Sequence, residues 1–212
     1  MNVSFWTKVA IAVQSALAAA DTISGITKAS PGVVTSTAHG MSNGAYVLME
    51  VTGMTQLNDR VFRIANVAAN TFELEGEDTT NYDTFVSGTA KEITFGTSMA
   101  TVIGLNASGG EYEYEDTTTV HVDQRTNVPT IASPAVYTFE NIWDVADPAL
   151  IALKVSSDAK SKRAIRLTFS NGQKVAFNTY VGATLTPGGA APGKVTTQVA
   201  LSLCARQTVY AT

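Results

Sequence analysis

The chain has 212 residues, of which 45% are hydrophobic and 15% are charged, and its formal net charge is −4. This length is enough for one hydrophobic core with a smaller satellite. The charged fraction is well below the roughly 25% that is usual for a soluble domain, and such a surface is typical of a subunit that copies of itself cover. Tight binding to nucleic acid phosphates needs clustered Lys and Arg, and the composition argues against it.

The densest basic cluster is Lys160, Lys162, Arg163 and Arg166. These residues follow a segment that we expect to be helical. Cations at the C-terminal end of a helix interact favourably with its dipole. We therefore interpret the cluster as a solvated helix end.

The N-terminal segment Thr7–Gln14 has the alternating pattern of a β-strand. Val9, Ile11 and Val13 fall on one side of it. The Ala-rich continuation to Ala20 is compatible with a strand or a helix. This apolar run lacks the charged start and cleavage site of a signal peptide and is too short to span a bilayer. We read it as part of the fold and expect no membrane partner.

Short β-branched runs separated by turn residues fill the next part of the chain, residues 21–88. Turn residues such as Asn43-Gly44 tolerate positive φ. Four or five short strands at intervals of roughly ten residues predict a small all-β module. The runs are Val33–Thr37, Tyr46–Val51, Val61–Val67 and Thr71–Leu74.

A long polar segment follows the strand-like stretch Lys91–Leu105 and the pair Gly109-Gly110. This segment, Glu111–Val128, is rich in acidic residues, threonine and tyrosine. It is too long for a tight turn, and a long excursion from a compact domain is usually functional or disordered. We expect a loop here that orders on assembly.

The C-terminal part combines one helix with four strands. Asp147-Pro148 places Asp at the N-cap and Pro at the first helical position. Asn171-Gly172, flanked by alternating apolar residues, is the strongest short-range signal for a β-hairpin. The predicted strands are Val136–Trp143, Arg163–Phe169, Lys174–Val181 and Val195–Leu203.

The sequence contains no group of residues with the spacing of a catalytic or metal-binding site. His39 precedes a turn glycine, where a structural hydrogen bond is the expected role, and His121 lies in the polar segment. No His, Cys and carboxylate set has metal-ligand spacing, and no phosphate-binding glycine loop is present. We predict no enzymatic activity, no catalytic, cofactor-binding or metal-binding residues, and no cofactor.

Two regions resemble known families. Arg163–Gly172, followed by Phe177 and Val181, resembles the helix-to-hairpin region of the lambda-like major tail tube proteins of long-tailed, siphovirus-type bacteriophages. Trp143, the helix after Asp147 and the final strand occur in the same order as in that family. This resemblance covers residues 1–20 and 91–212.

The middle segment is similar to a small β-domain inserted in many phage tail proteins, named for its likeness to the FCCH domain of ubiquitin-activating enzymes. The matching pattern runs from Ile23 through Pro31-Gly32 and Asn43-Gly44 to Asn70–Gly76. Together the resemblances imply an all-β fold with one short helix. They imply a tail-tube β-sandwich or barrel domain, residues 1–20 and 91–212, with an inserted FCCH-like β-domain, residues 21–90.

The family resemblance implies a structural virion protein of the phage tail, assembled in the host cytoplasm. Hexameric rings of such a protein stack into the tail tube, the conduit for DNA ejection. Its partners would be other copies of itself, the tape measure protein in the lumen, the tail tip or distal tail protein and the terminator protein. DNA would be present only in transit.

The polar segment is the candidate for contact between neighbouring rings. Its candidate residues are Glu111, Tyr112, Glu113, Tyr114, Glu115, Asp116, Thr117, Thr118, Thr119 and Arg125. Two other functions fit an all-β chain of this kind. One is a carbohydrate-binding or adaptor module of a tail tip, which Tyr82, Tyr112 and Tyr114 keep open. The other is a capsid decoration protein.

Overall fold

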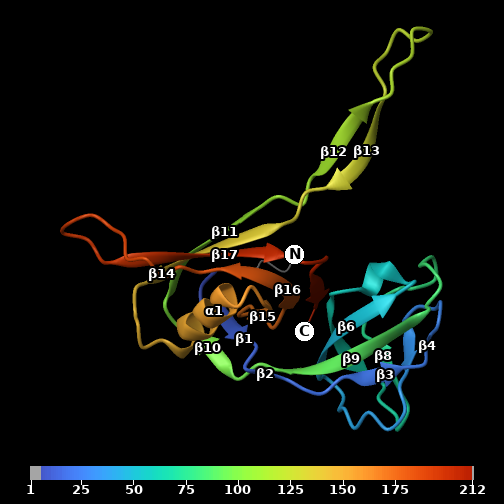
Figure 1. The fold of residues 1–212 in the computed structure, drawn as a ribbon, viewed down its shortest axis with the longest axis horizontal. Helices are drawn as coiled ribbons and strands as arrows, with labels where there is room; N and C mark the ends of the chain where they lie inside the picture. The colour runs from blue at the N-terminus through green and yellow to red at the C-terminus, as the bar shows by residue number, and fades with distance from the viewer. Residues whose placement is uncertain (1–5, 212) are drawn as a thin grey trace.

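The structure is a computed structural model that describes residues 6–211. It consists of two antiparallel β-sheets that lie side by side and a two-stranded arm that projects from the first sheet (Figure 1). The strands of the arm are β12 (Tyr112–Asp116) and β13 (Asn127–Ala132). One α-helix packs on the first sheet. The expected class, all-β with one short helix, is confirmed.

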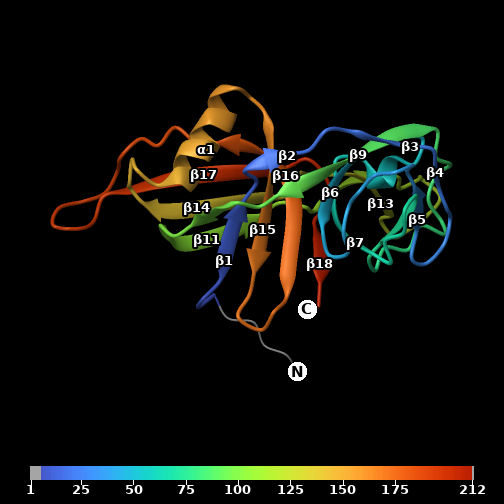
Figure 2. The same cartoon turned by 90° about the horizontal axis from the view of Figure 1, so that it is seen from below.

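The first sheet has the strand order β10-β1-β15-β16-β17-β14-β11, and β18 also pairs with β16. Figure 2 shows β14 and β17 crossing β1 and β15 at a steep angle, so that the sheet folds over its own core. The strands are β1 (Ala10–Val13), β10 (Thr97–Met99), β11 (Val102–Ser108), β14 (Val136–Ile142), β15 (Lys162–Thr168), β16 (Lys174–Gly182), β17 (Thr196–Leu203) and β18 (Thr208–Tyr210).

Helix α1 (Pro148–Asp158) covers this core, and its start is fixed by the predicted N-cap. The Asp147 carboxylate accepts hydrogen bonds from the backbone N–H groups of Ala149, at 2.7 Å, and Leu150, at 3.3 Å. Leu150 and Leu153 are fully buried against Phe139 and Phe177 from the crossing strands. The alternation of apolar and polar residues that predicted the strands thus places the apolar side chains on one face of the sheet, where they form a single core.

The second sheet has the order β2-β9-β6-β7-β8-β5-β4, with β3 also paired to β9. Its own core contains Phe62, Phe72 and Met49, all fully buried. A short 3-10 helix (Thr55–Leu57) follows β6. The strands are β2 (Ala16–Leu17), β3 (Asp21–Ile23), β4 (Gly25–Ile26), β5 (Val33–Thr35), β6 (Tyr46–Thr52), β7 (Val61–Ala65), β8 (Thr71–Leu74) and β9 (Ser87–Thr94).

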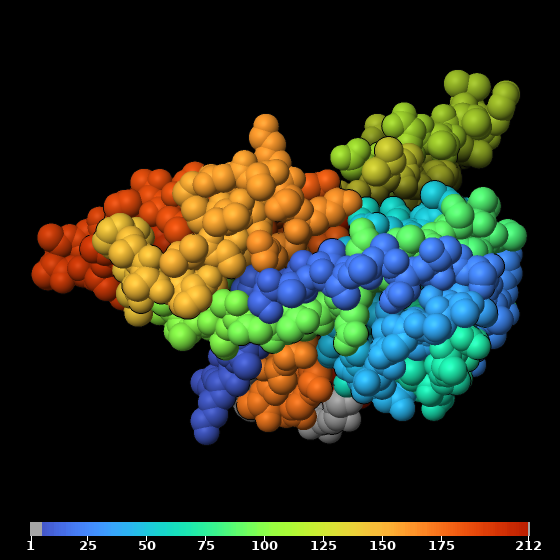
Figure 3. Space-filling view, turned by 60° about the horizontal axis from the view of Figure 1, so that its bottom comes forward, coloured from blue at the N-terminus to red at the C-terminus, as the bar shows by residue number. Residues whose placement is uncertain are grey.

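A third apolar cluster, the seam, joins the two sheets, which lie in direct contact (Figure 3). The Tyr210 hydroxyl accepts a 2.7 Å hydrogen bond from the backbone N–H of Arg63, and the Thr208 hydroxyl donates at 2.7 Å to the carbonyl of Val61. The two sheets therefore form one body held by β18. The seam residues are Tyr46, Leu48, Val61 and Ile93 from the second sheet and Ala164, Ala176 and Tyr210 from the first.

Two residues of the basic cluster, Lys162 and Arg166, lie at this junction, and of the four only Lys160 is exposed, so the interpretation of the cluster as a solvated helix end is wrong. Lys162 opens β15 and pairs with Asp59 at 2.7 Å. The guanidinium of Arg166 lies over the Phe95 ring, 4.8 Å from its centroid, and Arg163 donates to the Ser156 hydroxyl at 2.7 Å. Opposite charge and aromatic faces hold these cations more strongly than a helix end does.

Strand pairing decides the conformation of two further segments, the Ala-rich segment up to Ala20 and the segment Glu111–Val128. The Ala-rich segment up to Ala20 is extended, not helical, because Ser15 and Ala18 donate backbone hydrogen bonds to Thr94 and Glu92 beside β9. Here sheet pairing overrides the helix propensity of alanine. The expected loop Glu111–Val128 is part of a β-hairpin, in which β12 pairs with β13 and residues 117–126 form the turn.

Candidate functional site

The arm is the β-hairpin formed by β12 (Tyr112–Asp116) and β13 (Asn127–Ala132), together with the turn between them. It stands clear of both sheets (Figure 1), and each of its residues from 111 to 132 is exposed. An isolated hairpin of two strands is marginal in water. A segment with this much exposed surface is best explained by a partner outside its own chain.

Local hydrogen bonds close the arm where its strands end. The backbone N–H of Thr117 donates to the carbonyl of Thr126 at 2.8 Å, and the N–H of Thr126 donates to the Thr118 hydroxyl at 3.0 Å. The Asp116 carboxylate accepts from the N–H of Thr118 at 2.8 Å. Hydrogen bonds from the Thr118 side chain and backbone lower the pKa of Asp116 below its ordinary value.

We predict that acid loosens the end of the arm. Because the folded pKa of Asp116 is lowered, its stabilising effect is present above the ordinary pKa of about 4 and is lost as the pH falls through the folded value. Hydrogen exchange of the Thr118 amide should accelerate relative to amides of β15 on going from pH 5 to pH 3. An Asp116→Asn variant should lose this pH dependence, and an unchanged dependence in that variant would contradict the assignment.

The two faces of the arm differ in chemistry. Cross-strand partners share a face, so Tyr112 opposite Ala132 and Tyr114 opposite Pro129 form an aromatic face. Glu115 opposite Val128 belongs to the other face. At the tip, Val120 is 96% exposed and Val122 is 50% exposed. The tip is therefore aliphatic, in contrast to the acidic strand β12.

The arm also holds the entire net charge of the chain. Residues 111–132 contain five acidic side chains and one arginine, which leaves thirteen acidic and thirteen basic residues elsewhere. The remaining chain is therefore formally neutral. The acidic residues of the arm are Glu111, Glu113, Glu115, Asp116 and Asp123.

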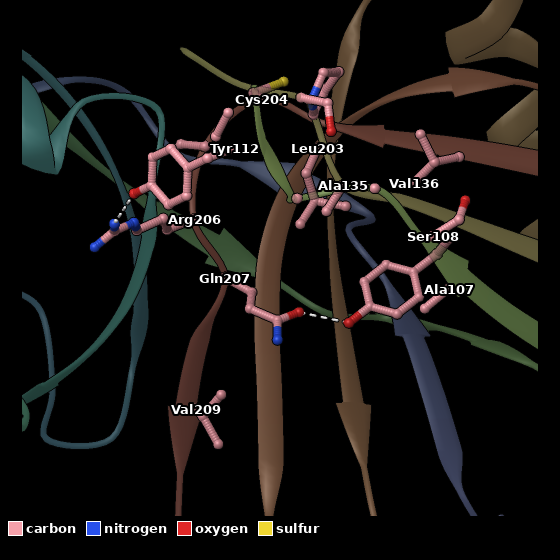
Figure 4. A pocket seen from close by; sticks show the side chains of 17 residues that line it. Ala107, Ser108, Tyr112, Ala135, Val136, Leu203, Cys204, Arg206, Gln207 and Val209 are labelled. Carbon is pink, nitrogen blue, oxygen red and sulfur yellow. Dashed lines mark hydrogen bonds between the residues drawn. The ribbon is translucent and has the colours of Figure 1, made fainter. Parts of the chain in front are cut away.

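A groove with a cavity volume of about 810 Å³ opens at the base of the arm, between β11, β14 and the segment that leads into β18 (Figure 4). The Tyr112 hydroxyl accepts a 3.3 Å hydrogen bond from Arg206, which ties the arm to that segment. The Tyr137 hydroxyl donates to the Gln207 side chain at 2.5 Å. Val209 is 62% exposed beside them. The walls are mainly small and apolar side chains.

The sequence-predicted contact residues all lie on the arm. Tyr112 to Asp116 form β12, Glu111 precedes it, and Thr117, Thr118, Thr119 and Arg125 belong to the turn. The groove was not predicted, because its walls come from three segments that are far apart in the sequence. Neither Gln207 nor Val209 belongs to a motif that would have marked it.

The other candidate residues are not brought together. His39 is 8% exposed, and its Nδ1 accepts a 3.2 Å hydrogen bond from the N–H of Met41, as a structural histidine would. His121 is exposed on the arm. Within residues 6–211, no group of three or more His, Cys, Asp or Glu side chains is placed to hold a metal ion. The same residues include no helix long and apolar enough to cross a membrane.

A family comparison gives the context of this surface. The family described as "Phage tail tube protein, TTP" matches residues 52–212, which include β7, β8 and β9 of the second sheet, the first sheet from β10 onward, helix α1 and the arm. The chain belongs to the phage tail tube protein family. This tail tube protein is therefore a structural component of the virion tail that associates with itself into a tube. A comparison with curated proteins finds none that matches the chain.

Proposed function

We propose that this tail tube protein forms hexameric rings that stack into the tube of a siphovirus-type tail, the conduit for DNA ejection. The observation that carries the proposal is the arm, an acidic hairpin whose residues 111–132 are all exposed in the part of the chain that the structure describes. Its ten sequence-predicted residues are the proposed contact between neighbouring rings. The tail tube family itself supports self-association.

Rings would close through the edges of the first sheet. Within the described residues, β11 has a single neighbour, β14, and β10 has a single neighbour, β1. None of the side chains of β11 is charged. An uncharged edge strand readily pairs with another chain, and closure into a barrel removes such edges. We propose that these edges meet strands of adjacent copies.

The bore would be lined by the outward face of β14 and β17. Gln198 and Ala200 are exposed there, and Glu140 lies opposite Gln198. Strands β14 and β17 contain one carboxylate and no basic residue, and the exposed Ile142 adds apolar surface, so DNA phosphates would be weakly repelled and would slide. DNA would then be a transient partner, after the tape measure protein has left the lumen.

Several finer proposals follow from the same assembly. The tail tip or distal tail protein and the terminator protein would bind the two ends of the tube, and assembly would take place in the host cytoplasm. Residues 1–20 and 91–212 would form the tube domain. The inserted domain, residues 21–90, would be FCCH-like and would lie on the outside of the tube.

Deleting residues 113–125 tests the proposal. The shortened chain should remain folded, because the arm contributes nothing to the three apolar clusters, but it should form no tubes. Negative-stain electron microscopy at rising protein concentration should show hollow tubes for the intact chain only. Circular dichroism and thermal unfolding of both proteins serve as the folding control.

Two outcomes would contradict the proposal. Tubes formed by the shortened chain would remove the arm from the contact between rings. A discrete trimer of the intact chain that never polymerises would favour a capsid decoration protein or a tail-tip module instead.

A further inference from the structure

The tip of the arm cannot reach the groove of its own chain. The arm leaves the body beside the groove and runs outward as a paired hairpin (Figure 1). Strand β12 has five residues, and at 3.3 Å per residue the paired part of the arm alone carries the tip roughly 17 Å outward. A segment that binds in the groove must therefore come from another molecule. In a tube, a neighbouring copy of the chain can supply such a segment to every subunit.

The groove has the chemistry of a receptor for an apolar segment with a negative charge. The described residues that line it include Arg206 as the one charged side chain and no carboxylate. Leu203, Val136 and Val209 contribute apolar surface, and Val209 projects into the open space in Figure 4. The polar ends of Tyr137 and Gln207 already bond each other.

The tip of the arm has the complementary chemistry. Val120 and Val122 expose apolar surface to water, and none of residues 6–211 buries it. Asp123 follows directly, so two valines and one carboxylate lie within four residues. Burial of the exposed valine surface would favour association by roughly 25 cal/mol per Å².

We propose that the groove at the base of the arm binds the tip of the arm, Val120–Asp123, of a second copy, with the valines against Val209 and the Asp123 carboxylate toward Arg206. This inference rests on the proposed function, since it names the receptor for the contact between rings. The contact is heterologous, because tip and groove are different surfaces. A heterologous contact that does not form a closed ring can be repeated without limit. One arm per copy is therefore enough to extend a stack of rings.

Disulfide trapping tests the pair. Cys204 is the free cysteine and is half-buried, so a Cys204→Ser background removes it. Val120→Cys and Val209→Cys are then introduced together, both at exposed positions. Assembled protein is treated with molecular oxygen and a copper catalyst. Since a disulfide requires Cα atoms about 4.4–6.8 Å apart, we expect a ladder of covalent oligomers on a non-reducing gel.

The matched control pairs Val120→Cys with Val86→Cys, which is 73% exposed on the second sheet, outside the groove. It should give no ladder. If the Val120→Cys and Val209→Cys protein forms tubes but gives no ladder, or gives only a covalent dimer, docking of the tip in the groove is wrong. The proposed function would then still stand. Absence of tubes from the unmodified chain would overturn the proposed function, and this inference with it.

Discussion

Replacing Tyr210 with alanine is expected to lower the free energy of unfolding by about 3–5 kcal/mol, the range for removing a large buried aromatic side chain. Tyr210 is 5% exposed, and its ring packs edge-to-face against Tyr46 across the seam. Burial raises the pKa of its hydroxyl, and that hydroxyl accepts the hydrogen bond from the Arg63 backbone. The substitution therefore removes apolar contact and a polar link between the two sheets.

Urea unfolding of the monomer measures this effect, and limited proteolysis reports whether the second sheet is loosened. The neighbouring residue in the same strand is the control. Val209 points away from the seam and is 62% exposed, so Val209→Ala should change the unfolding free energy by no more than about 0.5 kcal/mol. Equal effects of the two substitutions would contradict the role of Tyr210 as the link.

Replacing Glu77 with alanine should cost about 3–5 kcal/mol, because it leaves a buried cation without its anion. Glu77 forms a two-pronged ion pair with Arg60, one bond of which is 3.0 Å long, and the Arg60 side chain is 8% exposed. The Tyr82 hydroxyl donates to the same carboxylate at 2.6 Å. Tyr82 is thus engaged inside the second sheet and does not join the arm tyrosines in one site.

An exposed ion pair provides the comparison for this prediction. Lys154 and Asp158 lie four residues apart on the solvent side of α1, with side chains 37% and 63% exposed. Such pairs contribute about 0.3–0.5 kcal/mol, so Asp158→Ala should hardly shift the urea midpoint. A Glu77→Ala variant that unfolds at the same urea concentration as Asp158→Ala would show that Arg60 finds water or another acceptor.

Local sequence signals predicted the elements that are stabilised locally. The cap at Asp147 and the turn at Asn171-Gly172 each depend on a few adjacent residues, and both occur in the structure. Strand β17 was predicted for the same reason, since alternate residues from Thr197 to Leu203 are buried. The candidate contact residues, whose role stays a prediction, were selected because a long polar segment is conspicuous in a sequence with few charges.

Features that depend on contacts between residues far apart in the sequence could not be predicted from local patterns. The basic cluster resembled a helix end, but Lys162 finds Asp59, more than one hundred residues earlier, once the sheets pack together. The arm resembled a loop because acidic residues and threonines dominate the segment, and the alternation of Tyr112 and Tyr114 with glutamates in β12 is only five residues long. The groove arises where β11, β14 and the approach to β18 converge, and no local pattern encodes that convergence.

The two chain segments that connect the second sheet to the first both leave the first sheet at one place. The chain leaves the first sheet at Val13 and re-enters it at Thr97, and these two residues are paired neighbours in β1 and β10. A folded cassette could thus be exchanged there without breaking any pairing in the first sheet. A tube built from such subunits would be a scaffold for dense display of foreign domains. Any replacement cassette would have to supply an apolar patch that covers Ala164, Ala176 and Tyr210.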